Sequence, residues 1–393
     1  MDFQFSKEQK KFRQEVRAFL DAELPPGWVD YIGPTIDDTV VNREDGWQVF
    51  KDMARKLGEK GWLSMFWPEE YGGQSCSHID YLIFLEEIAR RGSPGYNAVG
   101  AKMLAPTLID YGNEEQKQRH LKPIARGEEF WCQGFSEPGA GSDLASLQTK
   151  AIKDGNHFII NGQKTWSTFA DYSDWCCLLA RSDPYSKRHK GLSFFLVDLS
   201  TPGVTVRSIK NILGEPDFSE IFFEDVRVPK GNMVGRENEG WQVVQAFLSY
   251  ERASIAPVAV VQTLIDGLAN YIKATPEREW TNSRQTLAQL AIEAEVGRLI
   301  CYRVAWLQDK GMATSQDAAM SRLYSTELLK RAATAAMKLL GLYGQLDQRE
   351  GIAPLRGWIE HLYLACIGAT IAAGTSEIQK NIIALAGLGL PRE

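Results

Sequence analysis

The 393-residue sequence has little of three patterns that mark common classes of protein. None of its six cysteines is in a C-x-x-C spacing, and a chain of this length does not need covalent staples, so we expect reduced, intracellular thiols. Its five histidines are scattered without ligand spacing, which predicts no metal site. No window approaches the roughly 18 uninterrupted apolar residues of a membrane span, and the charged N-terminal stretch has no apolar targeting core. These absences predict a cytoplasmic protein without a membrane partner.

Clustered positive charge is absent as well. The formal net charge is -6, and the basic residues are distributed along acidic helical stretches instead of forming a stripe. A phosphate backbone therefore has no matching surface, and we exclude nucleic acid as a partner.

Two kinds of sequence pattern divide the chain into three regions. Apolar residues recur at helical spacing in the first third, and the last third is rich in Ala and Leu with few prolines, as in an antiparallel helical bundle. Between them, alternating β-rich runs and an Asn161-Gly162 hairpin signal predict an all-β region over about 131–230. The expected helices cover residues 6–24, 44–61, 79–91, 114–126, 241–274, 283–310, 315–346, 355–368 and 376–385.

We therefore expect an α+β multidomain fold. The length and the 44% hydrophobic content are enough for more than one core. The boundaries we expect are an N-terminal α-helical domain over 1–130, a middle β domain over 131–235 and a C-terminal α-helical domain over 236–393.

The stretch WCQGFSEPGAGSD, residues 131–143, is the first that can carry chemistry. Its small residues let the backbone approach a flat ligand closely, and Ser136 and Ser142 offer hydroxyls. Glycines in a turn are more often only a turn, so this stretch alone does not assign a function.

The stretch NGQKTWST, residues 161–168, is the second. Trp166 and Thr168 are two apart on an expected strand, which predicts that they share one face. An aromatic ring beside a hydroxyl can flank a ring cofactor, although a tryptophan facing a core is the commoner explanation.

Taken together and in this order, these stretches resemble the flavin-dependent acyl-CoA dehydrogenase family over essentially the whole chain. The resemblance implies an N-terminal helical domain, a middle β-barrel and a C-terminal four-helix bundle, with FAD between barrel and bundle and a dimer of dimers as the assembly. The stretches that carry it are WPEEYGG, GNEEQKQRHLKPIARGE, FSEPGAGSD, NGQKTWST, FFEDVRVPKGNMVG, Gly240-Trp241 and GTSEIQKNIIA.

The resemblance also implies which residues contact the cofactor. Positions matching Phe135 and Ser136 face the flavin ring in this family, Ser142 meets the pantetheine arm of the substrate, and Trp166 and Thr168 cover the other side of the ring. A turn of small residues before a helix also suits an anionic pyrophosphate. The implied cofactor contacts are Phe135, Ser136, Gly141, Ser142, Trp166, Ser167, Thr168, Gly374, Thr375 and Glu377.

The catalytic base is missing from its common place. The family reaction removes a proton α to a thioester, and in many members the base is a glutamate directly before the Gly-Thr turn, where this chain has Ala373. Glu251 matches the base of other branches, and an apolar pocket raises the pKa of a carboxylate towards working pH. The alternative is that Glu251 forms only a solvated ion pair with Arg252 on the helix surface.

Ala373 keeps a role through its backbone. In the family the N–H at this position donates to the thioester oxygen as the enolate develops, so we include Ala373 in the catalytic set. The resemblance further implies that Arg252 organises the carboxylate or the CoA, and Tyr250 is a candidate for the acyl pocket.

The chain departs from the family where a neighbouring subunit usually grips the FAD pyrophosphate, because the R-x-x-F-G motif is absent. This looks like a bacterial subgroup that includes heterotetramers. We expect an acyl-CoA substrate, an electron-transfer flavoprotein as redox partner, and a homotetramer or an α2β2 heterotetramer. The alternatives are an acyl-CoA oxidase and a non-catalytic or half-competent subunit of a heterotetramer.

Overall fold

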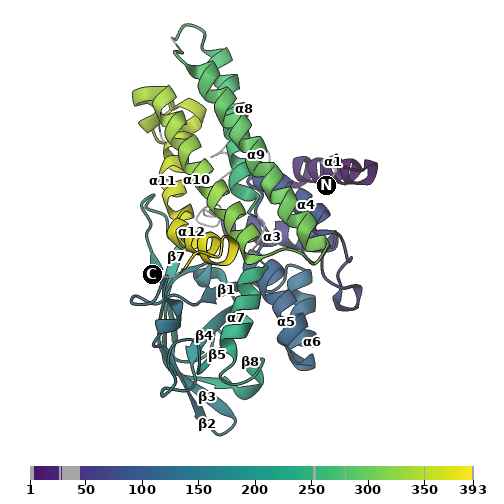
Figure 1. Ribbon diagram of the computed structural model, residues 1–393, viewed down its shortest axis with the longest axis vertical. Helices are drawn as coiled ribbons and strands as arrows, with labels where there is room; N and C mark the ends of the chain where they lie inside the picture. Colours follow the sequence, from purple (N-terminus) through teal and green to yellow (C-terminus); the bar gives the residue numbers. More distant parts are fainter. Residues whose placement is uncertain are drawn as a thin grey trace. The chain divides into compact units, whose positions relative to one another are not determined.

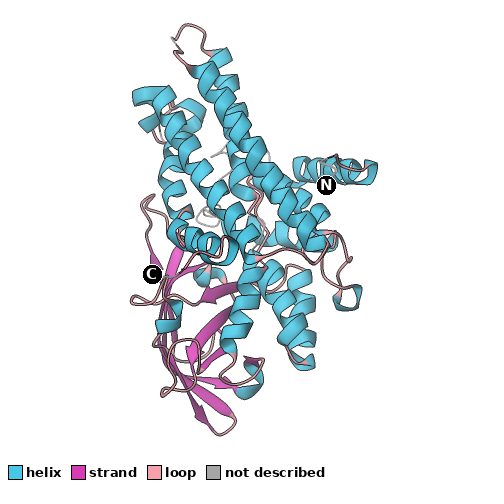
Figure 2. Cartoon of the chain, viewed as in Figure 1, coloured by secondary structure: helices cyan, strands magenta, loops and turns pink. Residues whose placement is uncertain are grey.

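The computed structural model describes residues 4–25, 28, 45–250, 254–278, 280–348 and 350–391. Helices come first, strands follow, and helices resume at Gly240 (Figure 1, Figure 2). The helices are α1 (Lys7–Glu23), α3 (Gly46–Glu59), α4 (His78–Arg91), α5 (Ala105–Tyr111), α6 (Glu114–Ala125), α7 (Gly240–Ser249), α8 (Ala256–Ala274), α9 (Ser283–Asp309), α10 (Ser315–Leu340), α11 (Trp358–Ala369) and α12 (Ser376–Ile382). The strands are β1 (Trp131–Gly134), β2 (Lys150–Asp154), β3 (His157–Thr168), β4 (Trp175–Arg181), β5 (Leu192–Asp198), β6 (Val204–Ile209), β7 (Phe218–Pro229) and β8 (Met233–Val234).

The chain packs into two compact units. The first takes the described residues of 1–38, 77–93 and 252–393 and is helical, and the second takes those of 39–76 and 94–251 and holds all the strands named above. This order of helices, sheet and helices confirms the predicted fold class. The expected domain boundaries at 130 and 235 stay a prediction.

The second unit is built on one mixed eight-stranded sheet. Its order is β6-β7-β3-β2-β4-β5-β8, and β1 adds to β4 in parallel. The central strands β4 and β5 are buried along nearly their whole length, as expected of strands covered on both faces. Phe247 of α7 packs on Phe194 of β5 with ring centroids 5.7 Å apart, so α7 covers one of these faces.

The first unit is a bundle in which α8, α9, α10 and α11 lie side by side (Figure 1). Leu264, Leu328 and Leu362, from three of these helices, are fully buried in its core. The longest helix, α9, has 27 residues and therefore spans about 40 Å. No helix in the described ranges is both long and apolar enough to span a bilayer.

One helix expected from the sequence was predicted wrongly. We expected a single helix over 241–274, and the structure has α7 and α8 instead. Pro257 lies in the first turn of α8, where a backbone N–H would have no intrahelical acceptor, so the proline favours a helix start at this point.

A buried ion network joins α1 to α4 and α9 in the first unit. The carboxylates of Glu86 and Glu87 are at most 2% exposed, and Arg13 contacts each of them at 2.7 Å. Arg13 also donates to the Tyr302 hydroxyl at 2.8 Å, and Arg17 contacts Glu87 at 2.8 Å. This network fixes α1 on the bundle.

We expect Arg13→Met to lower the free energy of unfolding by about 2 kcal/mol. Breaking a buried pair costs about 3–5 kcal/mol, but Arg17 still partners Glu87 and the Tyr302 hydroxyl still donates to Glu86. Denaturant unfolding of the full chain measures the change. Arg55→Met is the control, because the Arg55–Asp52 pair is more than half exposed and 3.7 Å long. Equal losses for the two variants would contradict the role of this network.

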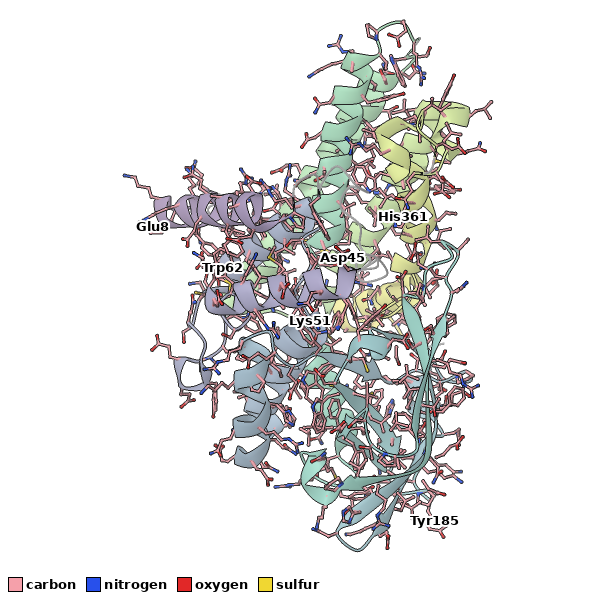
Figure 3. All side chains as sticks on the ribbon, turned by 180° about the vertical axis from the view of Figure 1, so that it is seen from behind. Glu8, Asp45, Lys51, Trp62, Tyr185 and His361 are labelled. Carbon is pink, nitrogen blue, oxygen red and sulfur yellow. The ribbon has the colours of Figure 1, made fainter. Side chains whose placement is uncertain are left out.

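His361 lies on α11 (Figure 3), and its burial should make the stability of the chain depend on pH. Burial lowers the pKa of His361 to about 4, from an ordinary value of 6.5. Between these values the unfolded chain binds a proton that the folded chain does not, so the free energy of unfolding should fall as the pH falls from 6.5 to 4. His361→Gln should flatten that part of the curve in thermal unfolding measured across this range. A curve of unchanged slope would refute the assignment.

Candidate functional site

The loop after β1 is a tight turn with a buried start. Phe135 is 2% exposed, and its ring packs on Phe247 with centroids 5.3 Å apart. Glu137 and Ala140 exchange backbone hydrogen bonds of 2.9 and 3.0 Å, which closes the turn over Pro138 and Gly139. The side chain of Phe135 is therefore core, and only the backbone at this position is left to contact a ligand.

Gly141 and Ser142, which the sequence predicted as ligand contacts, follow this turn, and both are exposed. A Cβ placed on Gly141 would meet nothing within 4 Å, so no neighbour requires a glycine here. The loop ends at β2, where Glu137 accepts hydrogen bonds from the backbone N–H groups of Gln148 and Thr149 at 2.6 and 2.8 Å. One carboxylate thus joins the two ends of the loop.

The end of β3 presents an aromatic ring and a hydroxyl on one face. Trp166 is 60% exposed and Thr168 is exposed, whereas Ser167 between them is fully buried. This confirms that Trp166 and Thr168 share a face, but that face is not a core. Among the residues that the structure describes, the Ser167 hydroxyl has no hydrogen-bond partner. Its side chain lies on the opposite face of the strand.

A β-bulge produces this arrangement. The pairing of β3 with β7 shifts register between Lys164 and Ser167, and Trp166 has φ of 61°, a left-handed value that is strained for a bulky residue. Without the bulge, strict alternation would place Lys164, Trp166 and Thr168 on one face. The structure instead buries Lys164 and exposes Trp166.

Lys164 is the residue that the sequence analysis missed. Its side chain is fully buried, and its Nζ donates to the Phe135 carbonyl at 3.0 Å and to Glu137 Oε1 at 2.8 Å. Burial lowers the pKa of Lys164 to about 8, against the attraction of Glu137. Burial acts to raise the pKa of Glu137, but Lys164 and the hydrogen bonds to Thr149 and Gln148 outweigh it and hold that pKa below its usual range. A lysine flanked by polar residues on a strand gave no sign of burial in the sequence.

The turn over 371–379 lies in the first unit and has two consecutive left-handed residues. Ala373 has φ of 51° and Gly374 has φ of 91°. Gln379 stabilises the turn, because its side-chain amide donates to the carbonyls of Ala373 and Gly374 at 3.2 and 3.1 Å. Ala373 is exposed, and within the described part of the chain its N–H has no acceptor. This N–H is therefore available to a ligand.

Thr375 and Glu377 form the start of α12. The Thr375 hydroxyl caps the helix by accepting from the Ile378 N–H at 3.2 Å. The pKa of the Glu377 carboxyl lies below its ordinary value, because the carboxylate accepts hydrogen bonds from its own backbone N–H and from Thr375. Both residues are thus ordered locally, and the carboxylate of Glu377 reaches solvent.

The structure brings some of the predicted residues together. Ser136 accepts a hydrogen bond from the Thr165 N–H at 2.9 Å, which places the 135–136 segment beside the 166–168 segment in the second unit. The turn at 373–377 belongs to the other unit. Glu251 and Arg252 lie outside the described residues, and the neighbouring Tyr250 donates its hydroxyl to Asp110.

Known proteins resemble the chain over its full length. Family models described as the acyl-CoA dehydrogenase N-terminal, middle and C-terminal domains match residues 6–128, 132–226 and 238–388. The curated protein "Acyl-CoA dehydrogenase FadE26" of Mycobacterium tuberculosis is 34% identical over 407 residues, covering 100% of this chain and 99% of that one.

Two solved structures are also similar to this chain over its full length. One, named "Tcur3481-Tcur3483 steroid ACAD", has a TM-score of 0.90 at 30% identity, and it covers 100% of both chains. The other, the ChsE4-ChsE5 complex from Mycobacterium tuberculosis, has a TM-score of 0.89 at 32% identity, also with 100% of both chains covered. The chain therefore belongs to the acyl-CoA dehydrogenase family of oxidoreductases.

Proposed function

We propose that this chain catalyses α,β-dehydrogenation of an acyl-CoA thioester to the 2-enoyl-CoA with FAD as cofactor. The observation that carries the proposal is the exposed pair of Trp166 and Thr168 on a strained bulge, beside the backbone of Ser136. Strained backbone conformations cluster at functional sites, so a bulky residue held in one on an exposed face supports a ligand contact at this position.

The residues present fit a flavin. A flat indole offers a face to a planar heteroaromatic ring, and the Thr168 hydroxyl on the same face can donate to a ring nitrogen. A flavin held here would supply the acceptor for the hydride that leaves the β carbon of the acyl group. Phe135, Ser136 and Ser167 would contribute only their backbone, because the Ser167 side chain lies on the buried face of the strand. The set of cofactor contacts that we propose is completed by Gly141, Ser142, Gly374, Thr375 and Glu377.

Two residues of the chain serve the removal of the α proton, one as the base and one as a hydrogen-bond donor. Glu251 accepts it as the general base, which requires a carboxylate whose pKa is raised by an apolar pocket. The Ala373 N–H donates to the thioester oxygen and stabilises the charge that develops on it. Ser142, Tyr250 and Arg252 bind the substrate in this proposal, and an electron-transfer flavoprotein is the redox partner.

The assembly we propose is a tetramer. The similarity to a complex named for two proteins, ChsE4 and ChsE5, favours an α2β2 heterotetramer over a homotetramer. The same similarity supports a second candidate function, in which this chain is a half-competent subunit that completes a partner's site. Because the chain has Glu251, we place it as the catalytic partner.

Purification of the chain alone tests the function. A yellow protein whose flavin absorption is bleached by an acyl-CoA without oxygen supports the dehydrogenase, and a colourless protein that turns yellow only with a partner chain supports the subunit. Rapid reoxidation by oxygen would identify an acyl-CoA oxidase. The panel of acyl-CoAs should include ring-bearing acyl groups, because a similar structure is named a steroid ACAD.

A further inference from the structure

The second unit contains a buried ion pair that the proposed mechanism does not use. Lys164 on β3 is fully buried, and Glu137, in the turn after β1, is 9% exposed. Lysine is almost never fully buried unless it is paired, and taking two charges out of water is costly. An apolar pair of similar volume would serve a core at least as well, so the presence of charges here calls for another reason.

The hydrogen bonds of the pair supply that reason. The Lys164 ammonium donates to the Phe135 carbonyl at 3.0 Å, and the next residue along β3, Thr165, donates its backbone N–H to the next carbonyl, that of Ser136, at 2.9 Å. Two consecutive residues of β3 thus hold two consecutive carbonyls of the 135–136 segment. Trp166 and Thr168 follow directly on the same strand.

Glu137 also holds backbone groups, those at the far end of the loop that starts after β1. Its two carboxylate oxygens accept the N–H groups of Gln148 and Thr149 in addition to the Lys164 ammonium. The carboxylate therefore fixes both ends of the loop that carries Gly141 and Ser142. Of these four contacts with backbone groups, two hold the carbonyls of the 135–136 segment and two close the loop that carries Gly141 and Ser142.

From this arrangement we infer that Lys164 and Glu137 are positioning residues for the flavin, which hold the 135–136 and 166–168 segments in register and thereby set the affinity for FAD. The inference rests on the proposed function, because it takes these two segments as the flavin contacts. Both side chains are buried, so in this proposal they act on the flavin without contacting it. The effect travels through the backbone of Phe135, Ser136 and Thr165.

The test replaces both charges at once. In the Glu137→Gln/Lys164→Met double variant neither a buried charge nor an ammonium donor remains, so the fold should persist. We expect the FAD dissociation constant to rise about tenfold or more, because charge-assisted hydrogen bonds to the backbone are lost. We also expect the visible absorption bands of the bound flavin to shift, a change that a purely structural role would not cause.

The sheet offers a matched control. Asp154 and Arg227 form an ion pair of 3.0 Å in the same sheet, with side chains 56% and 57% exposed. The Asp154→Asn/Arg227→Met double variant makes the same chemical change at the surface, and its affinity for FAD should equal that of the unaltered chain. If the buried double variant binds FAD as tightly as the unaltered chain, with an unshifted spectrum, the inference is overturned.

Two further measurements keep the inference falsifiable. If the buried double variant does not fold, Lys164→Met decides, because the Glu137 carboxylate then keeps the backbone N–H groups of Gln148 and Thr149 as donors and no ammonium is left buried without a partner. Weaker FAD binding by this variant supports positioning, and unchanged binding refutes it. Failure of the proposed function gives a different result. A chain that binds FAD but whose flavin is bleached by no acyl-CoA is not a dehydrogenase. The ratio of FAD affinities between the variant and the unaltered chain still tests the ion pair in that case.

Discussion

Replacing Glu251 by glutamine should lower kcat for acyl-CoA dehydrogenation by about 10²–10⁴-fold. The amide is close in shape to the carboxylate but cannot accept the α proton, so only the proton transfer is removed. Binding of FAD should persist, because Glu251 is not among the proposed flavin contacts. Stopped-flow bleaching of the flavin by an acyl-CoA, without oxygen, measures the step directly.

Glu239→Gln provides the control for this variant. Glu239 directly precedes α7, its side chain is 45% exposed, and its nearest cation, Arg236, is 4.0 Å away. This variant should bleach at the unaltered rate. Full bleaching by Glu251→Gln would show that another group takes the proton.

A second variant tests whether the two positions of the base are equivalent. Adding Ala373→Glu to Glu251→Gln puts a carboxylate where many family members have it, directly before the Gly-Thr turn. Some bleaching should return if a side chain from this turn reaches the same α carbon. No recovery, together with retained FAD, would mean that the two positions do not reach the same point.

The sequence was sufficient for the fold because long periodic segments dominate it. The helices expected over 79–91 and 114–126 correspond to α4 and α6 within one residue at each end. In the structure both helices start at polar caps, since Ser77 and Asn113 each accept a backbone N–H from the first turn. The family followed from seven ordered stretches and is confirmed by three matching family models.

The part of the site that the sequence could not predict depends on tertiary contacts. The bulge at Trp166 requires β7 as a partner, and β7 is separated from β3 by three intervening strands along the chain. The partner of the buried Lys164 is Glu137, which lies 27 residues earlier in the sequence. Neither contact can be predicted from the alternation of side chains along a strand. Alternation places Lys164 on the same face as Trp166, and this prediction is wrong.

The left-handed conformation of Ala373 was also invisible in the sequence. Alanine rarely adopts positive φ, and nothing in IAAGTSEIQ distinguishes Ala372 from Ala373. In the structure Ala373 has φ of 51°, and Arg322 donates to the carbonyl of Ala372 at 2.9 Å, which supports the turn from α10. A strained residue with a free N–H at a turn is typical of a functional site.

Ala373→Pro should lower kcat by about 10²–10³-fold, the loss that follows removal of one donor to a developing oxyanion. Proline has no N–H, and its ring fixes φ near -65°, so it both removes the donor and opposes the observed φ of 51°. Two further variants separate these effects. Ala373→Gly keeps the N–H and fits positive φ, so its kcat should equal that of the unaltered chain.

Ala373→Val keeps the N–H but adds a β-branched side chain to a left-handed residue, so it raises the strain without removing the donor. If the N–H is what matters, the valine variant should retain most of the kcat that the proline variant loses, at equal FAD content by absorption. Equal losses in the valine and proline variants would instead assign the effect to the shape of the turn. The series therefore decides whether Ala373, which has no chemistry in its side chain, acts through its backbone.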